Sequence, residues 1–152
     1  MKTLDTKEWI AVIVSVFVVG FFFVFGNTLV SFFTENAGQN SMSAVPEVLI
    51  QEVLIGQGEE AMSGDRVTVH YIGHFIDGEI FDSSVERNEP FQFVLGVGSV
   101  IQGWDEGIAG MKVGGKRIIS IPPELGYGTN DYGPIPGGST LIFEIELLKV
   151  ER

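Results

Sequence analysis

A chain of 152 residues has room for one domain of ordinary size and a short additional segment. Its formal net charge of −11 argues against nucleic-acid binding, because phosphate contacts need clustered Lys and Arg, and it disfavours adhesion to an anionic lipid surface. The chain contains no cysteine, so disulfide bonds and thiol chemistry are excluded, while the redox state of its compartment stays open.

An apolar segment near the amino terminus dominates the hydropathy of the chain. Residues 10–33 read IAVIVSVFVVGFFFVFGNTLVSFF and contain no charged side chain. As a helix this segment would be about 36 Å long, which is enough to cross a hydrocarbon core of about 30 Å. We therefore predict a single transmembrane helix over residues 10–33, preceded by a short tail at residues 1–9.

The rival interpretation of this segment is a cleaved signal peptide. Signal peptides carry an apolar region of about 7–15 residues that ends at a cleavage site of small residues. The apolar run is longer than that, and the candidate site SMSA at residues 41–44 lies well past its end. The pattern favours an uncleaved anchor.

Basic residues around the predicted span indicate its orientation. Lys2 and Lys7 precede the span, whereas no Lys or Arg follows it until Arg66. The positive-inside rule then predicts a cytoplasmic amino terminus and an extracytoplasmic domain, in a periplasm or at the cell exterior. Residues 34–46 are mostly small and polar, which predicts a flexible linker and leaves residues 47–152 as the folded domain.

Alternation of side chains predicts antiparallel strands in that domain. At residues 67–75, Val69 and Tyr71 share one face while His70 lies on the other. Residues 141–150 alternate in the same way, with apolar side chains opposite glutamates. Further strand candidates are EVLIQEVLI at 47–55, FQFVL at 91–95 and KRIISI at 116–121.

In one stretch the apolar residues recur with a different period, and this pattern predicts a short helix. Its apolar residues recur at steps of three and four, which places them on one face of one or two helical turns. They are Ile101, Trp104, Ile108 and Met111. Ser99 is a candidate cap for its start, and Gly110 or Gly114 for its end. The predicted fold is α+β, an antiparallel sheet covered on one face by a short helix.

Familiar ligand motifs are incomplete in this chain. The segment GMKVGGK at 110–116 lacks the Ser or Thr that completes a phosphate-binding loop, and it runs into a predicted strand instead of a helix. His70 and His74 would lie about 13 Å apart along one strand, too far to share a metal ion. We therefore expect no metal site and no cofactor.

Aromatic side chains at alternate strand positions are more often plain core than a binding site. Four sequence blocks nevertheless occur in a distinctive order: VHYIGHFIDGEIFDSS, PFQFVLG, VIQGW and TLIFEIELL. Together they resemble the FKBP-type peptidyl-prolyl cis/trans isomerase domain over residues 47–152. The resemblance implies an FKBP-like antiparallel sheet wrapped around one short α-helix.

The resemblance also implies an apolar pocket with Trp104 as its floor and the backbone N–H of Ile101 as a hydrogen-bond donor to the ligand. The residues implied to bind substrate are Phe81, Phe91, Val100, Ile101, Trp104 and Ile135. Those implied to be catalytic are Tyr71, Asp82, Tyr127 and Phe143, and those implied to support the site are Arg87 and Phe93. Arg87 is expected to pair with Asp82 or a neighbour. Pro134 and a slightly shortened loop at 128–133 depart from the family pattern, and both fall on the pocket rim.

The function implied by this resemblance is peptidyl-prolyl cis/trans isomerisation. It needs no covalent step, acts on proline-containing polypeptides and is inhibited by macrolides. Combined with the predicted anchor, it suggests assistance to the folding of exported or membrane proteins. The alternative is a membrane-anchored module that binds proline-containing peptides, or a folding chaperone with little catalytic activity.

Overall fold

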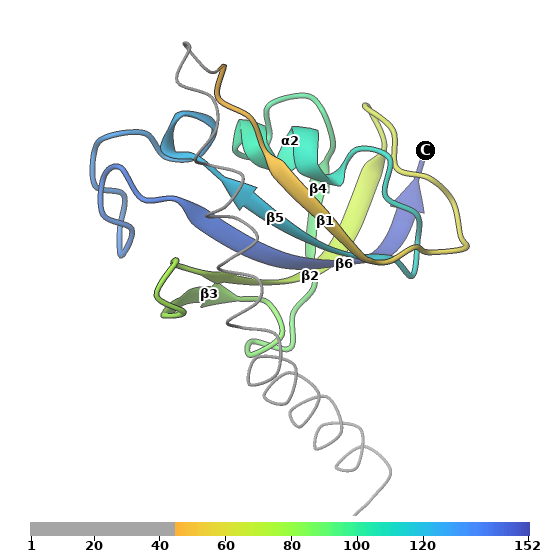
Figure 1. Ribbon diagram of the computed structural model, residues 1–152. Coiled ribbons are helices and arrows are strands. Elements are labelled where there is room, and N and C mark those ends of the chain that lie inside the picture. The colour runs from red at the N-terminus through yellow and green to blue at the C-terminus, as the bar shows by residue number, and fades with distance from the viewer. Residues whose placement is uncertain (1–44) are drawn as a thin grey trace, which may run out of the picture. The chain divides into compact units, whose positions relative to one another are not determined.

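The computed structural model describes residues 45–152 (Figure 1). The predicted tail, the predicted transmembrane helix and nearly all of the predicted linker lie outside this range. Among residues 45–152, no helix is both long and apolar enough to cross a membrane.

Six strands form one sheet in which each paired strand is antiparallel to its neighbour. The order is β1-β5-β6-β2-β3, and β4 also pairs with β2, along the first half of that strand. The strands are β1 (Leu49–Leu54), β2 (Arg66–His74), β3 (Ile80–Ser83), β4 (Phe91–Val94), β5 (Lys116–Ile121) and β6 (Leu141–Glu151). The five strands predicted from alternation are confirmed. The short strand β3 was not predicted, because its sequence IFDS does not alternate between apolar and polar residues.

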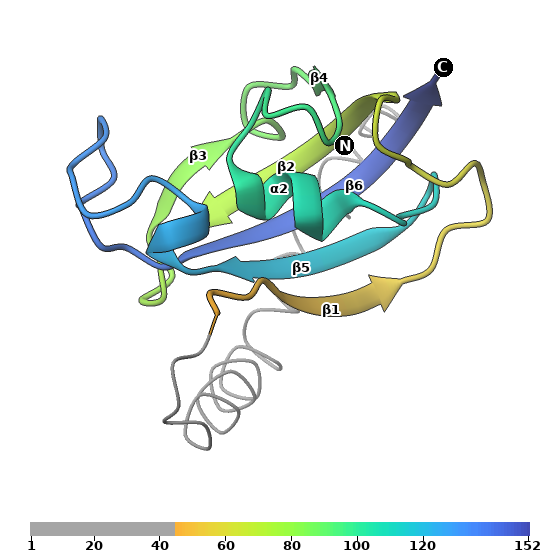
Figure 2. The same ribbon diagram turned by 90° about the horizontal axis from the view of Figure 1, so that it is seen from above.

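Helix α2 (Gln102–Ile108) lies over one face of this sheet (Figure 2). Two glycines allow it to approach β5 closely. A Cβ atom on Gly103 would lie 2.4 Å from Ile121 Cγ2, and one on Gly107 would lie 2.9 Å from Ile119 Cδ1. Larger residues at these two positions would push the helix away from the sheet.

The ends of α2 differ in part from the prediction. The helix begins after Ile101, whose carbonyl oxygen accepts the N–H of Trp104, and no side chain caps it, so the cap predicted at Ser99 is wrong. It ends at Ala109 and Gly110, and Gly110 has the positive φ of 78° that favours glycine there.

A buried arginine completes the carboxyl end of α2. Arg117 Nη1 donates hydrogen bonds to the carbonyl oxygens of Gly107 at 2.7 Å and Ala109 at 3.0 Å. The same guanidinium binds the Glu52 carboxylate on β1. The last carbonyl groups of a helix have no partner within it, so Arg117 satisfies two of them and ties the helix to the edge of the sheet.

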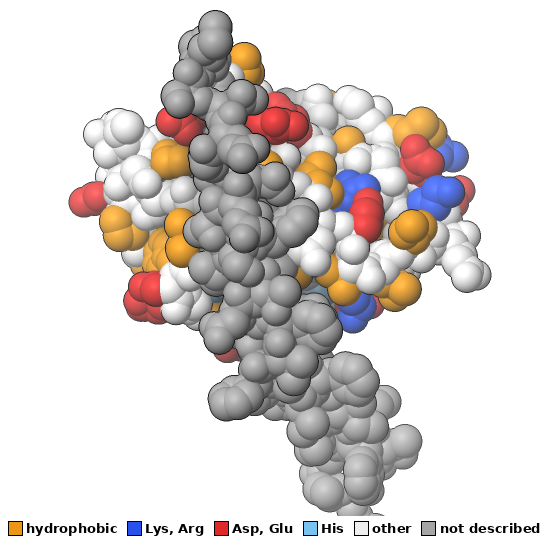
Figure 3. Space-filling view, in the orientation of Figure 1, with side chains coloured by type: hydrophobic (Ala, Val, Ile, Leu, Met, Phe, Trp, Pro, Cys, Tyr) orange, Lys and Arg blue, Asp and Glu red, His pale blue; other side chains and the backbone are white. Residues whose placement is uncertain are grey.

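The two faces of the sheet have different chemistry, as alternation predicted. On β6, Leu141, Phe143, Ile145 and Leu147 are all buried against α2 and the facing strands. On the opposite face Lys116 pairs with Glu146 at 3.1 Å. Figure 3 shows basic side chains beside acidic ones on the right half of its visible face. The core, and any apolar site within it, therefore lies on the α2 side.

Candidate active site

A cavity of about 490 Å³ opens on the α2 side of the sheet. Its volume falls within the range of about 300–1,000 Å³ that is usual for small-molecule sites. The residues that line it are Tyr71, Phe81, Asp82, Phe91, Ser99, Val100, Ile101, Trp104, Tyr127, Tyr132, Pro134, Ile135 and Phe143. They come from four strands, one helix and two long loops.

The structure brings all ten residues that were predicted to be catalytic or substrate-binding to this one cavity. The two predicted supporters, Arg87 and Phe93, contact lining residues without lining the cavity themselves. Sequence reasoning missed Ser99 and Tyr132 as lining residues, and it treated Pro134 only as a departure on the rim. The one available signal for Tyr132 was its position three residues before Ile135, in a loop whose conformation the sequence does not determine.

Trp104 forms the floor of the cavity and is only 4% exposed. Three aromatic rings meet it edge-on, with ring centroids at 5.1 Å for Tyr71, 5.2 Å for Phe143 and 5.9 Å for Phe91. Edge-to-face pairs of this kind add about 0.5–1.5 kcal/mol each beyond area burial. Because the rings hold one another in place, the apolar surface is fixed in shape.

Phe93 supports this arrangement from behind. Its ring stacks on Phe91 with the centroids 5.6 Å apart, and it lies 5.6 Å from Trp104. On the other side of the cavity, Phe81 meets Phe143 edge-on at 5.6 Å. Phe91 is 39% exposed, so it forms the outer part of the wall, whereas Phe143 is 3% exposed and forms the inner part.

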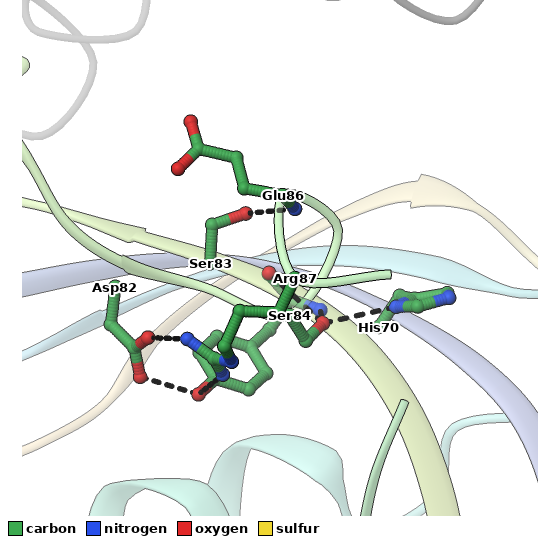
Figure 4. A network of polar contacts seen from close by, with 7 residues as sticks. His70, Asp82, Ser83, Ser84, Glu86 and Arg87 are labelled. Atoms are coloured by element: carbon green, nitrogen blue, oxygen red, sulfur yellow. Dashed lines mark hydrogen bonds and ion pairs between the residues drawn. The ribbon is translucent and has the colours of Figure 1, made fainter. Parts of the chain in front are cut away.

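The polar side of the cavity consists of Asp82 and Tyr71, and Arg87 binds both of them (Figure 4). The Tyr71 hydroxyl donates to Asp82 Oδ2 at 2.5 Å, and Arg87 Nη2 donates to the Tyr71 hydroxyl oxygen at 2.9 Å. Arg87 Nη1 donates to Asp82 Oδ1, which is the pair expected from the sequence. The carboxylate is therefore held from two sides.

This network determines the protonation of its members. Burial raises the pKa of Tyr71, and the hydrogen bond to Asp82 raises it further, so Tyr71 stays a donor. Burial by itself would raise the pKa of Asp82 as well, but the hydrogen bonds from Tyr71 and Arg87 outweigh it and hold that pKa below its ordinary value. Asp82 is thus ionised at neutral pH.

A fully buried serine anchors Tyr71 on the strand. Ser84 Oγ accepts the backbone N–H of Tyr71 at 2.8 Å, and Ser84 N–H donates to the Tyr71 carbonyl at 3.0 Å. His70 Nδ1 lies 3.0 Å from the same Ser84 oxygen (Figure 4). The Ser84 hydroxyl is therefore occupied by structural bonds and is not placed to act as a nucleophile.

Two donors at the cavity have no acceptor within residues 45–152. The indole Nε1 of Trp104 is buried and unpartnered, and the backbone N–H of Ile101 makes no hydrogen bond. The buried Trp104 donor costs about 1–3 kcal/mol, whereas the partly buried Ile101 N–H is free to bind a carbonyl oxygen of a ligand. For Ile101 this agrees with the role expected from the resemblance.

Two tyrosines build another part of the rim. The rings of Tyr127 and Tyr132 stack with centroids 4.5 Å apart and an angle of 13°. Paired hydrogen bonds between Tyr132 and Ile135, at 2.8 and 3.0 Å, close the loop that carries them. Burial, and then the charges of Tyr132 and Asp82, raise the pKa of Tyr127, so its hydroxyl stays protonated.

The arrangement suits the binding of a flat, apolar group that carries a few polar atoms at its edge. No histidine lines the cavity to serve as a base beside a nucleophile, and residues 45–152 contain no cluster of at least three metal-ligating side chains. An amide whose nitrogen belongs to an apolar ring has the required shape. The donors at Ile101 and Tyr127 line the same cavity.

Comparison with known proteins agrees with this geometry. Residues 57–148 match the family model described as FKBP-type peptidyl-prolyl cis-trans isomerase. An "FK506-binding protein" of Neisseria meningitidis serogroup B is 53% identical over 104 residues, which cover 68% of this chain and 95% of the relative. The mouse "Peptidyl-prolyl cis-trans isomerase FKBP2" is 54% identical over 94 residues, which cover 61% of this chain and 67% of the relative. The crystal structure of AtFKBP13 superposes with a TM-score of 0.64 at 40% identity, covering 67% of this chain and 91% of that structure.

Proposed function

The chain belongs to the FKBP-type peptidyl-prolyl cis-trans isomerase family and is a peptidyl-prolyl isomerase, and we propose that the cavity over Trp104 is where it acts on proline-containing polypeptides. One observation carries the proposal: ten residues scattered between positions 71 and 143 line a single cavity with an apolar floor.

The chemistry follows from the electronic structure of the amide. An Xaa–Pro bond rotates over a barrier of about 18–20 kcal/mol, because resonance is lost when the amide is twisted. The twisted amide has a less polar carbonyl group than the planar amide, so its transfer from water into an apolar cavity costs less. The cavity therefore stabilises the transition state more than the ground state, which is the requirement for catalysis.

Each part of the cavity has a role in this proposal. Trp104, Phe143 and Phe81 enclose the proline ring, while the Ile101 N–H and the Tyr127 hydroxyl hold the chain on either side of it. Asp82, kept ionised by Tyr71 and Arg87, acts on the carbonyl of the residue that precedes proline. Because the aromatic rings of the cavity are held in place, they orient the proline ring of the substrate without having to move.

The proposal is tested with the purified full-length chain in non-ionic detergent. We expect it to accelerate cis/trans exchange in a short Xaa-Pro peptide, and we expect FK506 to inhibit the exchange by occupying the same cavity. Loss of exchange in Trp104→Ala, with retention in the outer-face variant Thr68→Ala, would support the assignment. Full activity in Trp104→Ala would overturn it.

The cellular role is a second part of the proposal. The apolar run at 10–33 supports membrane anchoring, and Lys2 and Lys7 before it support a cytoplasmic amino terminus with the isomerase domain outside. There the enzyme would assist exported or membrane proteins, whose slow proline steps take about 10–100 s at 25 °C. Protease added to right-side-out spheroplasts should digest the domain, and resistance until lysis would contradict this orientation.

A further inference from the structure

The fold gathers many of the charged side chains of the domain at two opposite ends of the sheet. β2 ends, β5 ends and β6 begins at the same end of the sheet, with His74 paired to Ile142 and Ile121 paired to Leu141. In Figures 1 and 2 the β5–β6 loop and the β2–β3 turn lie at this end, and the carboxyl terminus lies at the other. Most residues that line the cavity belong to this end or to its loops, which we call the cavity end.

The cavity end is strongly acidic. Segments 75–90 and 122–140 contain seven carboxylates and one basic residue, Arg87, for a formal net charge of −6. The carboxylates are Asp77, Glu79, Asp82, Glu86, Glu89, Glu124 and Asp131, and all but Asp82 are exposed. At the other end, segments 55–66, 109–117 and 148–152 contain six basic and four acidic residues, a net charge of +2.

Ion pairing leaves most of the negative charge at the cavity end uncancelled. Away from the cavity, Lys116 pairs with Glu146, Arg117 with Glu52, and Lys149 with Glu151. At the cavity end, the single guanidinium is committed to Asp82. Within residues 45–152, Glu86, Glu89 and Glu124 have no ion pair, so their charges are not cancelled.

These carboxylates are close in sequence to lining residues. Glu89 precedes Phe91 by two positions, Glu124 precedes Tyr127 by three, and Asp131 adjoins Tyr132. They do not form a site of their own, because the site is the apolar cavity that they surround. Charges of one sign around a low-dielectric cleft raise the local concentration of an oppositely charged substrate and its association rate by about 10- to 1,000-fold.

We propose that the enzyme selects Xaa–Pro segments that carry Lys or Arg within a few residues of the proline. The inference rests on the proposed function of the cavity and adds the chemical class of its preferred substrate. The cavity takes the proline ring, and the acidic surroundings attract the basic neighbours. At physiological salt the Debye length is about 8 Å, so the effect reaches only the residues next to the proline and weakens as salt is added.

The test compares three peptides that share one Xaa-Pro core and differ only in two flanking residues, which are both Lys, both Gln or both Glu. The purified full-length chain in non-ionic detergent is assayed at about 20 mM and at about 500 mM ionic strength. We expect kcat/KM for the Lys peptide to exceed that for the Glu peptide about tenfold at low salt, and the ratio to fall to about twofold or less at high salt. Equal values at low salt, or a ratio that salt does not change, would overturn the inference.

A matched pair of double variants locates the effect. Glu86→Gln with Glu89→Gln removes two charges at the cavity end, and Glu59→Gln with Glu60→Gln removes two at the other end. The first should lower the Lys/Glu ratio about threefold or more, and the second should leave it nearly unchanged. Equal effects of the two double variants would also overturn the inference. Turnover of the Gln peptide separates the two proposals: if it is absent, the proposed function of the cavity fails, whereas if it is present without a Lys preference, only this inference fails.

Discussion

Gly73 on β2 lies directly opposite Phe143 on β6, with no space between them for a side chain. A Cβ atom on Gly73 would lie 2.8 Å from Phe143 Cε1 and 2.7 Å from Phe81 Cζ. Two aromatic walls of the cavity therefore occupy the volume that a side chain at position 73 would need. The shape of the cavity depends on this missing side chain as much as on the rings themselves.

Gly73→Ala should impair catalysis more than folding. The added methyl group must displace the rings of Phe81 and Phe143, and we expect kcat/KM to fall about tenfold or more, because such misplacement of catalytic groups costs about 100-fold per ångström. Peptide exchange and denaturant unfolding should be measured on the same preparation. Thr68→Ala on the same strand is the control, and an unchanged kcat/KM in Gly73→Ala would contradict the expectation.

Phe143→Tyr tests the apolar character of the inner wall. Phe143 is 3% exposed and faces Trp104, so a hydroxyl added there enters apolar surroundings. Without a partner this hydroxyl should cost about 1–3 kcal/mol, which is roughly a ten- to hundredfold loss of turnover. Glu146→Gln, on the opposite face of the same strand, should exchange peptide at the normal rate. Equal rates for Phe143→Tyr and the unmodified protein would exclude a role for this wall.

Arg87→Gln should change the pH dependence of the domain. The pKa of Asp82 lies below its ordinary value of 3.8 in the folded chain, so the carboxylate contributes stability that is complete above 3.8 and is lost as the pH falls through the lowered pKa. Without the guanidinium the pKa of Asp82 rises towards its unfolded value, so the carboxylate contributes less stability at neutral pH and less of that stability is lost on acidification. Unfolding midpoints of Arg87→Gln and of the unmodified chain, measured between pH 3 and 7, report this difference in pH dependence.

The control for this titration is Lys116→Gln, which removes a basic residue from a pair far from Asp82. Its unfolding midpoints should follow those of the unmodified chain at the acidic end of the range. Identical pH profiles for Arg87→Gln and the unmodified chain would show that Arg87 does not hold the ionised form of Asp82.

Arg117→Met should destabilise the helix that carries the cavity floor. It removes two hydrogen bonds to the end of α2 and leaves Glu52 without its partner, at a cost of about 2–4 kcal/mol in the free energy of unfolding. The chain has two tryptophans, so a Trp9→Phe background makes Trp104 the sole fluorescent reporter. Lys116→Met, which loses only an exposed pair, should cost about 1 kcal/mol or less. Equal losses for the two variants would refute the role of Arg117.

Strands and their faces could be predicted because burial on one side imposes a period on the sequence. Tyr71 and Phe143 follow that period, and the structure places both on the inner face. The start of α2 was mispredicted at Ser99 because Ile101 occupies the cap position and no side chain caps the helix, so the start carries no capping residue in the sequence. The role of Arg117 was missed because its partners on the helix are backbone carbonyl groups, which carry no sequence signature.

The site was predictable where its residues lie on regular elements and less so where they lie in loops. Tyr132 lines the rim because hydrogen bonds to Ile135 fold its loop back, and the sequence does not reveal that turn. The separation of charge between the two ends of the sheet could not be predicted from the sequence either. Segments 75–90 and 122–140 meet only because β2, β5 and β6 run antiparallel, so their joint charge depends on the topology of the sheet.

The closed loop that carries Tyr127 and Tyr132 has an energetic consequence for ligand capture. Stacked rings and backbone bonds already hold the entrance open in the free chain, and Asp131 Oδ1 accepts the Gly137 N–H at 2.8 Å as a further brace. Ordering a mobile loop on arrival would cost about 1–2 kcal/mol for each residue immobilised. Here that entropy is lost during folding, so a polypeptide that binds does not have to order the loop, and this preorganisation adds to its affinity.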